Sequence, residues 1–259
     1  MKKTIMAVLA TAYLVSPEAP LMANEVDTKR GQRPITLGVG VIWEDKVYED
    51  YEDSDKFMPV PLVLWEGKKF FFRADTFGYK LIESGPWEIA PIIALEGEGY
   101  DDSSSDALDG MGDRDLWVGA GAHIIWQPAK YGLKLQGTGD ITDESNGGRV
   151  SGEAFYETSV NNWYLRGTAM AEWVSEGFNQ YYYGVDRDDV IDGVRPRYRT
   201  TDAVDYHIGG SVGYTLDKWL FIGFARYSFF SDEVDDSPIT EDDQMLSLGA
   251  GVAYTFGGP

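Results

Sequence analysis

The stretch MLSLGAGVAYTF, residues Met245 to Phe256, decides the fold because its two faces differ in kind. Every second residue from Leu246 onward is apolar or aromatic. The residues between them are all small: Ser247, Gly249, Gly251, Ala253 and Thr255. A period of two predicts a β-strand. An apolar face that ends in aromatic residues, opposite a face of small residues, is typical of a strand that crosses a membrane as part of a β-barrel.

The same alternation recurs along the chain and predicts an all-β fold. Eleven segments are strand candidates: 34–44, 57–65, 68–79, 87–97, 115–127, 131–141, 148–158, 161–174, 204–217, 219–230 and 245–256. Bacterial single-chain barrels have an even number of strands, so one strand is missed or split in this count. The short stretch 179–184 is one candidate for the missing strand, and an error within 57–97 is the other. We therefore predict 10–12 strands and favour 12.

The second faces of the strands distinguish a membrane barrel from a soluble β-sandwich. A sandwich turns Lys, Glu and Thr to water, whereas several second faces here carry Gly, Ala, Ser and Thr with isolated charges. Aromatic residues end many of the apolar faces, as in the girdles of membrane barrels: Trp43, Trp87, Trp126, Trp163 and Trp173. Lipid cannot satisfy an open sheet edge, so we predict a closed antiparallel transmembrane β-barrel. A secreted soluble β protein is the alternative.

Two kinds of connection join the predicted strands. Some are short turns, such as 66–68, 127–130 and 216–218. Others are long and acidic: the segment 44–55 holds seven carboxylates and one lysine, and 96–115 holds eight carboxylates and one arginine. We predict short periplasmic turns at one rim and long acidic loops at the outer rim.

The first residues of the chain and its composition indicate the cellular compartment of the protein. A basic start and the apolar run Ile5 to Val15 predict a signal peptide over residues 1–23, cleaved after Ala23 or, less well, after Ala19. Residues 24–259 are then one outer-membrane barrel domain. The absence of cysteine excludes a disulfide-stapled fold and a cysteine-anchored lipoprotein. A net charge of -21 makes binding to nucleic acid improbable. These features predict the outer membrane of a Gram-negative bacterium.

Five residues are candidates for a site in the lumen because they lie on the inward faces of predicted strands: His123, His207, Asp205, Arg166 and Glu172. A hydrolase would need a histidine with a nucleophile and a carboxylate close by. No ordered spacing of that kind occurs, and no HxxxH or HExxH zinc motif occurs either. We predict that these residues form ion pairs in the lumen, with no catalytic residue and no cofactor.

The acidic loops are candidates for loosely bound Ca²⁺ or Mg²⁺, since these cations prefer carboxylate oxygens. The weak candidates are Asp186, Asp188 and Asp189, together with the run 101–115, and neither group has EF-hand spacing. The alternative is a solvated surface, or loops that meet lipopolysaccharide phosphates through divalent cations. The segment 184–203 differs because it mixes acids with four arginines, and we predict that it is an ordered lid or plug.

Four short motifs resemble those of the MipA/OmpV family of outer-membrane proteins, over most of residues 30–256. Tyr182, Tyr183, Gly184 and Val185, followed by an acidic stretch and then by Arg197 and Tyr198, resemble the family's loop motif. The stretch 110–115 (GMGDRD) is similar to the central motif. The stretches 237–239 (SPI) and 214–219 (YTLDKW) are similar to the C-terminal signature. The 96–109 region departs from the pattern in being longer and more acidic.

The resemblance implies a non-enzymatic barrel that acts as a scaffold. In that role it would bring a lytic transglycosylase and a penicillin-binding murein synthase together at the outer membrane. A small cation-preferring pore or uptake channel is the alternative function, and a barrel hydrolase on His123 or His207 is the third.

Overall fold

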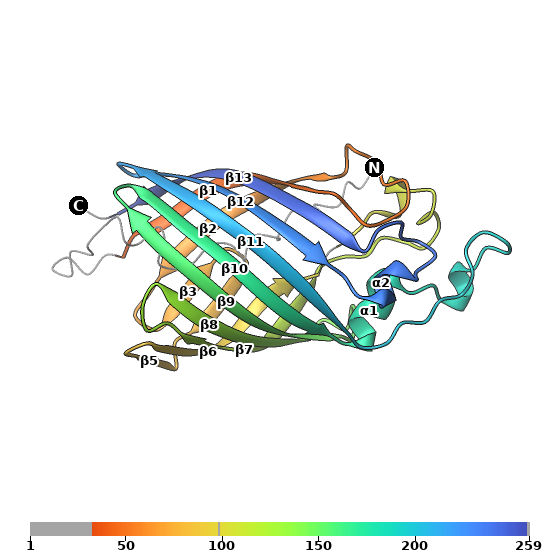
Figure 1. Cartoon of the computed structure of the whole chain (residues 1–259), viewed down its shortest axis with the longest axis horizontal. Helices are drawn as coiled ribbons and strands as arrows, with labels where there is room; N and C mark the ends of the chain where they lie inside the picture. The colour runs from red at the N-terminus through yellow and green to blue at the C-terminus, as the bar shows by residue number, and fades with distance from the viewer. Residues whose placement is uncertain (1–32, 98, 258–259) are drawn as a thin grey trace.

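The computed structural model describes residues 33–97 and 99–257, and these residues form one closed antiparallel β-barrel (Figure 1). Its strands are β1 (Ile35–Glu44), β2 (Phe57–Glu66), β3 (Phe70–Arg73), β4 (Thr76–Tyr79), β5 (Ile82–Ser84), β6 (Trp87–Glu96), β7 (Trp117–Trp126), β8 (Tyr131–Asp140), β9 (Gly148–Val160), β10 (Trp163–Val174), β11 (Ala203–Leu216), β12 (Trp219–Phe229) and β13 (Gln244–Phe256). The helices are α1 (Glu176–Tyr183) and α2 (Asp232–Asp235), with 3-10 turns η1 (Asp102–Ser104) and η2 (Arg187–Asp189).

The barrel has twelve strand positions, which confirms the favoured strand number. Strands consecutive in sequence pair with each other except β4 and β5, β1 pairs with β13, and the ring closes where β4 pairs with β6. Short β5 also pairs with β6, next to β4, so β4 and β5 are two pieces of one barrel strand. The register shifts by one residue between the pieces, opposite Pro91, which has no N–H to donate.

The missing strand lies inside the predicted segment 68–79. That segment is not one strand but the β3–β4 hairpin, which turns at Ala74 and Asp75. The alternative position, 179–184, was wrong because most of it belongs to helix α1. The predicted signal peptide, residues 1–23, lies outside the described residues, so its cleavage site stays a prediction.

The stretch Met245–Phe256 forms nearly all of β13 and has the two faces that its alternation predicts. Leu248 and Phe256 are exposed on the membrane-facing side, while Ser247 and Ala253 are buried on the lumen side. The small lumen face is not an empty channel wall. A Cβ atom at Gly249 would lie 2.0 Å from Cε1 of Phe224, and one at Gly251 would lie 2.6 Å from Cδ1 of Leu62. The small residues therefore accommodate large side chains from neighbouring strands.

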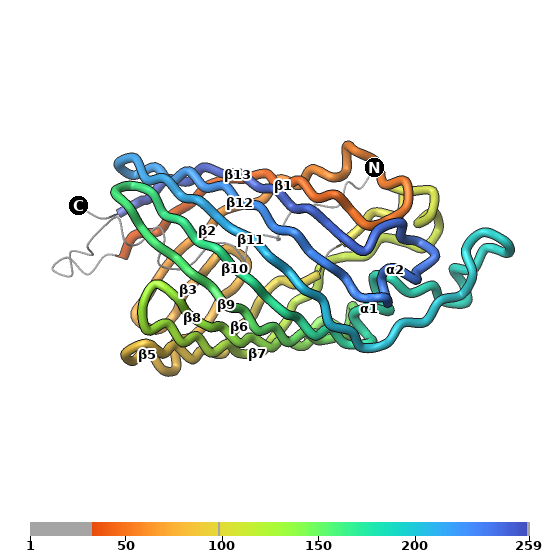
Figure 2. Tube along the Cα trace, in the orientation of Figure 1, coloured from red at the N-terminus to blue at the C-terminus, as the bar shows by residue number. Residues whose placement is uncertain are grey.

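The two rims differ in the length of their connections (Figure 2). Turns of two to four residues join β2 to β3, β5 to β6, β7 to β8, β9 to β10 and β11 to β12 at the rim where β1 begins and β13 ends. We call this the inner rim, since short turns face the periplasm in bacterial barrels. The long segments 45–56, 97–116, 175–202 and 230–243 lie at the opposite, outer rim, with both helices.

The largest hydrophobic cluster lies in the outer segments and not in the barrel wall. Buried residues from four outer segments and the adjacent strand ends pack together, among them Tyr48, Leu108, Phe178, Tyr182 and Ile239. We call this folded layer the cap. Among the described residues, none of the helices combines the length and the apolar character that a membrane-spanning helix needs.

Candidate functional site

Side chains from β2, β3, β6 and β7 form the first of several ion-pair networks inside the barrel. Arg73 donates to both carboxylate oxygens of Glu88 at 2.7 and 2.9 Å, and its Nε atom donates to Glu66 at 2.5 Å. His123 Nε2 lies 2.8 Å from the same Glu88 carboxylate. The Arg73 guanidinium also stacks over Phe71, with 3.9 Å between its Cζ atom and the ring centroid. His123 is thus held as a member of a structural network.

Arg166 lies in a second network on β9 and β10. Its guanidinium donates to Glu153 at 2.5 Å and to Glu157 at 3.0 Å, and the Tyr164 hydroxyl donates to Glu157 at 2.7 Å. Alternate strand positions on neighbouring strands place all four groups on the lumen face. In this network Arg166 forms ion pairs with lumen carboxylates, as its position on the strand predicts.

The second histidine lies in a third network, nearer the outer rim, and the two histidines do not meet. Arg149 bridges Glu96 and Glu172, while His207 Nδ1 lies 2.9 Å from the Ser228 hydroxyl. His207 Nε2 is 3.8 Å from Glu172, which is too far for a hydrogen bond. Ser228 is fully buried. Asp205, which the sequence placed beside His207, accepts a hydrogen bond from the backbone N–H of Ser231 in the cap.

The cap contains three of the four family-like motifs. Tyr182 and Tyr183 are fully buried, and the Tyr182 hydroxyl donates to the carbonyl of Asp115 at 3.0 Å. Ser237 donates to the carbonyl of Tyr183 at 2.7 Å. Gly184 ends α1, where a Cβ atom would lie 2.2 Å from the Gln180 side chain. The motifs are therefore the contact points between separate outer segments.

The segment between α1 and β11 is ordered, but it is not a plug. A bridge between Val185 and Tyr198 closes its base, and the residues between them form an arm that projects beyond the outer rim (Figure 1). Tyr198 donates to the carbonyl of Glu233, whereas Arg197 is exposed. The arm thus extends away from the barrel, although it was predicted to fold onto it as a lid or plug.

Arg195 holds the arm to the cap, a role that the sequence did not single out. It is 4% exposed, and its guanidinium donates to the carbonyls of Asp189, Ala107 and Asp109 at 2.8, 2.7 and 3.1 Å. Because one buried guanidinium donates to carbonyls of both the arm and the loop after β6, Arg195 fixes the arm to the cap. The arginine-rich composition of the arm was the only signal for it.

Two outer tyrosines show how closed the cap is. Tyr100 packs edge-on against Tyr48, with 4.9 Å between ring centroids, and burial raises the pKa of Tyr100 to about 12. Burial also raises the pKa of Tyr181, whose hydroxyl accepts from the backbone N–H of Asp115. Both phenols thus stay protonated in the physiological range.

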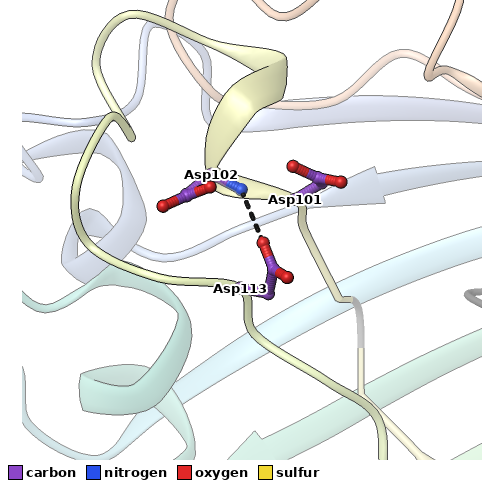
Figure 3. A group of neighbouring side chains, drawn as sticks. All are labelled: Asp101, Asp102 and Asp113. Carbon is purple, nitrogen blue, oxygen red and sulfur yellow. Dashed lines mark hydrogen bonds between the residues drawn. The ribbon is translucent and has the colours of Figure 1, made fainter. Parts of the chain in front are cut away.

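Three carboxylates come together in the loop that follows β6. Asp101, Asp102 and Asp113 each place one oxygen within 4.8 Å of the other two (Figure 3). The backbone N–H of Asp102 donates to Asp113 at 3.2 Å, and Asp101 caps η1. Among the described residues this is the one group of three possible ligands. Of the predicted candidates, Asp188 and Asp189 lie on η2 in the arm and Asp186 directly precedes it, and the three do not form such a group.

The inner rim carries positive charge around the inner end of the lumen. Its turns, together with Arg33, hold five basic residues, Arg33, Lys68, Lys69, Lys130 and Lys218, and one acidic residue, Asp217. The strand ends beside these turns carry Glu66 and Glu83, which form ion pairs with Lys80. A cavity of about 610 Å³ opens there between the turns 85–86 and 127–130, and its lining holds Lys130 with three carboxylates, Glu83, Glu88 and Glu157. The described residues of the four long outer segments instead hold 25 acidic and seven basic residues.

Comparison with known proteins gives the family. The sequence model described as "MltA-interacting protein MipA" matches residues 37–256. The chain belongs to this family. It is 30% identical over 244 residues to the MltA-interacting protein of Escherichia coli (strain K12), covering 91% of this chain and 96% of that protein. It is 25% identical over 177 residues to the outer membrane protein OmpV of Vibrio cholerae, covering 65% of each.

Solved structures with a similar arrangement of strands are outer-membrane barrels. The COG4313 outer membrane channel from Pseudomonas putida F1 matches with a TM-score of 0.47 and 10% identity, covering 86% of this chain and 95% of that one. The NanC porin matches with a TM-score of 0.39 and 10% identity, covering 86% and 99%. The protein is an outer-membrane β-barrel of the MipA family.

Proposed function

We propose that this barrel is a non-enzymatic docking protein that holds a lytic transglycosylase at its inner rim. Through that enzyme it also brings a penicillin-binding murein synthase to the outer membrane. The name of its E. coli relative, MltA-interacting protein, supports a transglycosylase partner. A periplasmic partner of an outer-membrane barrel meets the inner rim, so the inner rim is the docking surface.

The charge of the inner rim is the observation that carries this assignment. The inner-rim turns, together with Arg33, hold five basic residues and one acidic residue, on a chain whose net charge is -21. Lys68, Lys69 and Lys130 are exposed on turns, beyond the membrane-facing tryptophans Trp65 and Trp126. Complementary charge guides encounter and fixes orientation, so the partner should present an acidic face.

The size of the rim limits how many partners it holds. Twelve strands about 4.8 Å apart, tilted by about 40°, give a backbone diameter of about 24 Å. With side chains the rim covers about 900 Å², close to the roughly 800 Å² that one protein contributes to a standard interface. The rim therefore has room for one enzyme, and a second enzyme would bind to the first.

Neutralising the exposed rim lysines tests the proposal. The triple variant Lys68→Gln, Lys69→Gln, Lys130→Gln should bind a purified lytic transglycosylase at least about tenfold more weakly than the wild type, because each lost contact removes attraction and slows association. Biolayer interferometry at low and high salt would measure this, and the wild type should lose affinity with salt while the variant changes less.

A matched triple variant serves as control. Arg187, Arg197 and Arg199 are exposed at the outer rim, and changing all three to Gln removes the same charge from the opposite end. That variant should bind the enzyme as the wild type does. Equal weakening by both triple variants would reject the inner rim as the docking surface, and absence of binding by the wild type would reject the docking function itself.

The absence of catalysis is part of the proposal. The grouping that most resembles a hydrolase site is Ser228, His207 and Glu172, but Ser228 is fully buried and the histidine–carboxylate distance is 3.8 Å. A His207→Ala variant that lost an esterase or lipase activity present in the wild type would contradict this part.

A further inference from the structure

The β3–β4 hairpin is joined to the rest of the barrel by short ladders of backbone hydrogen bonds. Among the described residues, β3 pairs with β2 only along residues 64–66, and β4 pairs with β6 only along residues 92–94. Long ladders join the other long strands, and β10 for example pairs with β11 from Trp163 to Val174. Local opening is easiest where few backbone bonds hold a unit, so the hairpin is the part of the wall that separates most readily from its neighbours.

The hairpin itself is a compact unit. Its two strands pair with each other along their whole length. On the membrane-facing side, the centroid of the Phe70 ring lies 5.8 Å from that of Phe77 and 5.1 Å from that of Tyr79. At the inner end of the hairpin, the backbone N–H of Lys80 donates to the carbonyl of Lys69. These contacts hold the hairpin together independently of β2 and β6, so it can separate from both strands as one piece.

Arg73 of the hairpin provides contacts that the short ladders lack. Its Nε atom donates to Glu66 of β2 at 2.5 Å, and its two terminal nitrogens donate to Glu88 of β6 at 2.7 and 2.9 Å. One side chain therefore binds the hairpin to the strands on both sides of it. Arg166 is the contrasting case, since its carboxylate partners lie on β9, which already pairs with β10 along the whole of β10. The ion pairs of Arg73 thus replace backbone bonds, whereas those of Arg166 add to them.

A buried aromatic ring completes the attachment on the lumen side. Phe71 of the hairpin is fully buried and packs with Ala90 and Ile92 of β6. The Arg73 guanidinium stacks over the same ring, with 3.9 Å between its Cζ atom and the ring centroid. Loss of this guanidinium would therefore break the ion pairs and also uncover the ring that packs against β6.

We propose that the β3–β4 hairpin is a hinged flap in the barrel wall, that Arg73 holds it closed, and that its release opens a gap between β2 and β6. The hinges are the connections at residues 67–69 and 80–81, since hinge motions are absorbed at the ends of elements. β5 keeps its own pairing with β6 from Ile82 to Ser84, so the wall near the inner rim stays closed. The open state is the minor one, because lipid does not satisfy the freed backbone groups.

Hydrogen–deuterium exchange of the protein in lipid nanodiscs, read by mass spectrometry, measures this opening segment by segment. In the wild type, residues 70–79 should exchange faster than the segments of β9, β10 and β11. Arg73→Gln should raise exchange over 70–79 by at least about tenfold, because it breaks largely buried ion pairs, and should leave β9 to β11 unchanged. The matched variant Arg166→Gln should leave exchange of the hairpin unchanged.

The chain has no cysteine, so an introduced disulfide can hold the flap closed. Thr76 of β4 and Ala94 of β6 lie opposite each other, and opposite residues of antiparallel strands are close enough for a disulfide. With both positions changed to Cys in Arg73→Gln, oxidation should return exchange over 70–79 to the wild-type level, and dithiothreitol should restore fast exchange. Thr36→Cys with Thr255→Cys, which joins β1 to β13, is the control and should leave fast exchange of the hairpin unaffected.

Two results would overturn the proposal. One is exchange over 70–79 as slow as that of β9 to β11 in the wild type. The other is a uniform rise across the barrel in Arg73→Gln, which would show that this residue supports the whole barrel and does not hold one element. Heat-modifiable migration on gels shows whether each variant has formed the barrel. If Arg73→Gln does not assemble, Glu66→Gln removes only the contact with β2 and should raise exchange in the same segment.

Discussion

At the scale of single residues, the small face of β13 is matched to the large residues that fill it. The sequence predicted that face and its direction, because membrane and lumen impose opposite chemistry on alternate positions. It did not predict which side chains occupy the space. Phe224 and Leu62 come from β12 and β2, and their approach to Gly249 and Gly251 depends on the strand registers of the closed barrel.

A single methyl group at Gly249 should therefore destabilise the barrel. The Cβ atom of Gly249→Ala would overlap the Phe224 ring, and overpacking of this kind costs about 1–3 kcal/mol. Urea unfolding of protein refolded in lipid vesicles would measure the loss. The matched control is Gly152→Ala, whose Cβ atom meets nothing within 4 Å and which should unfold like the wild type. Adding Phe224→Leu to Gly249→Ala should restore most of the stability, and a failure to do so would contradict the overlap.

The lumen histidines show the same limit of sequence reasoning. Their inward direction followed from strand alternation, and the structure has both buried in the lumen. Their partners Glu88 and Ser228 lie on neighbouring strands, at positions fixed by register and not by any local motif. Sequence alone can therefore predict a charged lumen, but not its separation into distinct networks.

At the scale of elements, the long strands were predictable and the hairpin and helix were not. The β3–β4 turn uses Ala74 at a φ of 57°, a conformation that usually signals itself through Gly or Asn. Helix α1 contains three consecutive tyrosines, which favour a strand by intrinsic preference. The cap overrides that preference by burying Phe178, Tyr182 and Tyr183 together, with Ser175 as the N-cap.

Loss of the Arg195 anchor should free the arm and leave the barrel intact. In Arg195→Ala the carbonyls of Ala107, Asp109 and Asp189 lose their donor, and removing hydrogen bonds from a charged group costs about 1.5–3 kcal/mol each before compensation by water. Limited proteolysis should then cut the arm, residues 186–197, several times faster, with no change in the heat-modifiable barrel band. Arg187→Ala, an exposed change in the same arm, should be cut like the wild type. Equal protection of both variants would show that Arg195 does not hold the arm.

At the scale of the whole molecule, the barrel is polarised in both charge and closure. The outer end is acidic and covered by a hydrophobic cap, whereas the turns at the inner end are mainly basic and border a cavity of about 610 Å³. The sequence predicted the acidic outer loops from composition. It could not predict the cap, since its members come from segments more than a hundred residues apart that meet only when the barrel closes. This polarity suits a protein that meets its partner on one side of the membrane.

The cap also bears on the choice between a docking protein and the small pore that is the alternative function. A twelve-stranded barrel lies between the small barrels that side chains fill and the porins that hold a channel. Closure therefore depends on the cap, and wild-type protein in planar bilayers should give no unitary current steps. The double variant Phe178→Ala, Tyr182→Ala removes two rings that lie 4.9 Å apart at the centre of the cap, and it should give intermittent steps that favour cations because Glu96 and Glu172 lie beneath. Gly152→Ala, which leaves the cap unchanged, is the control. Steady current through the wild type would show that the cap does not close the barrel and would make the pore the better account of the fold.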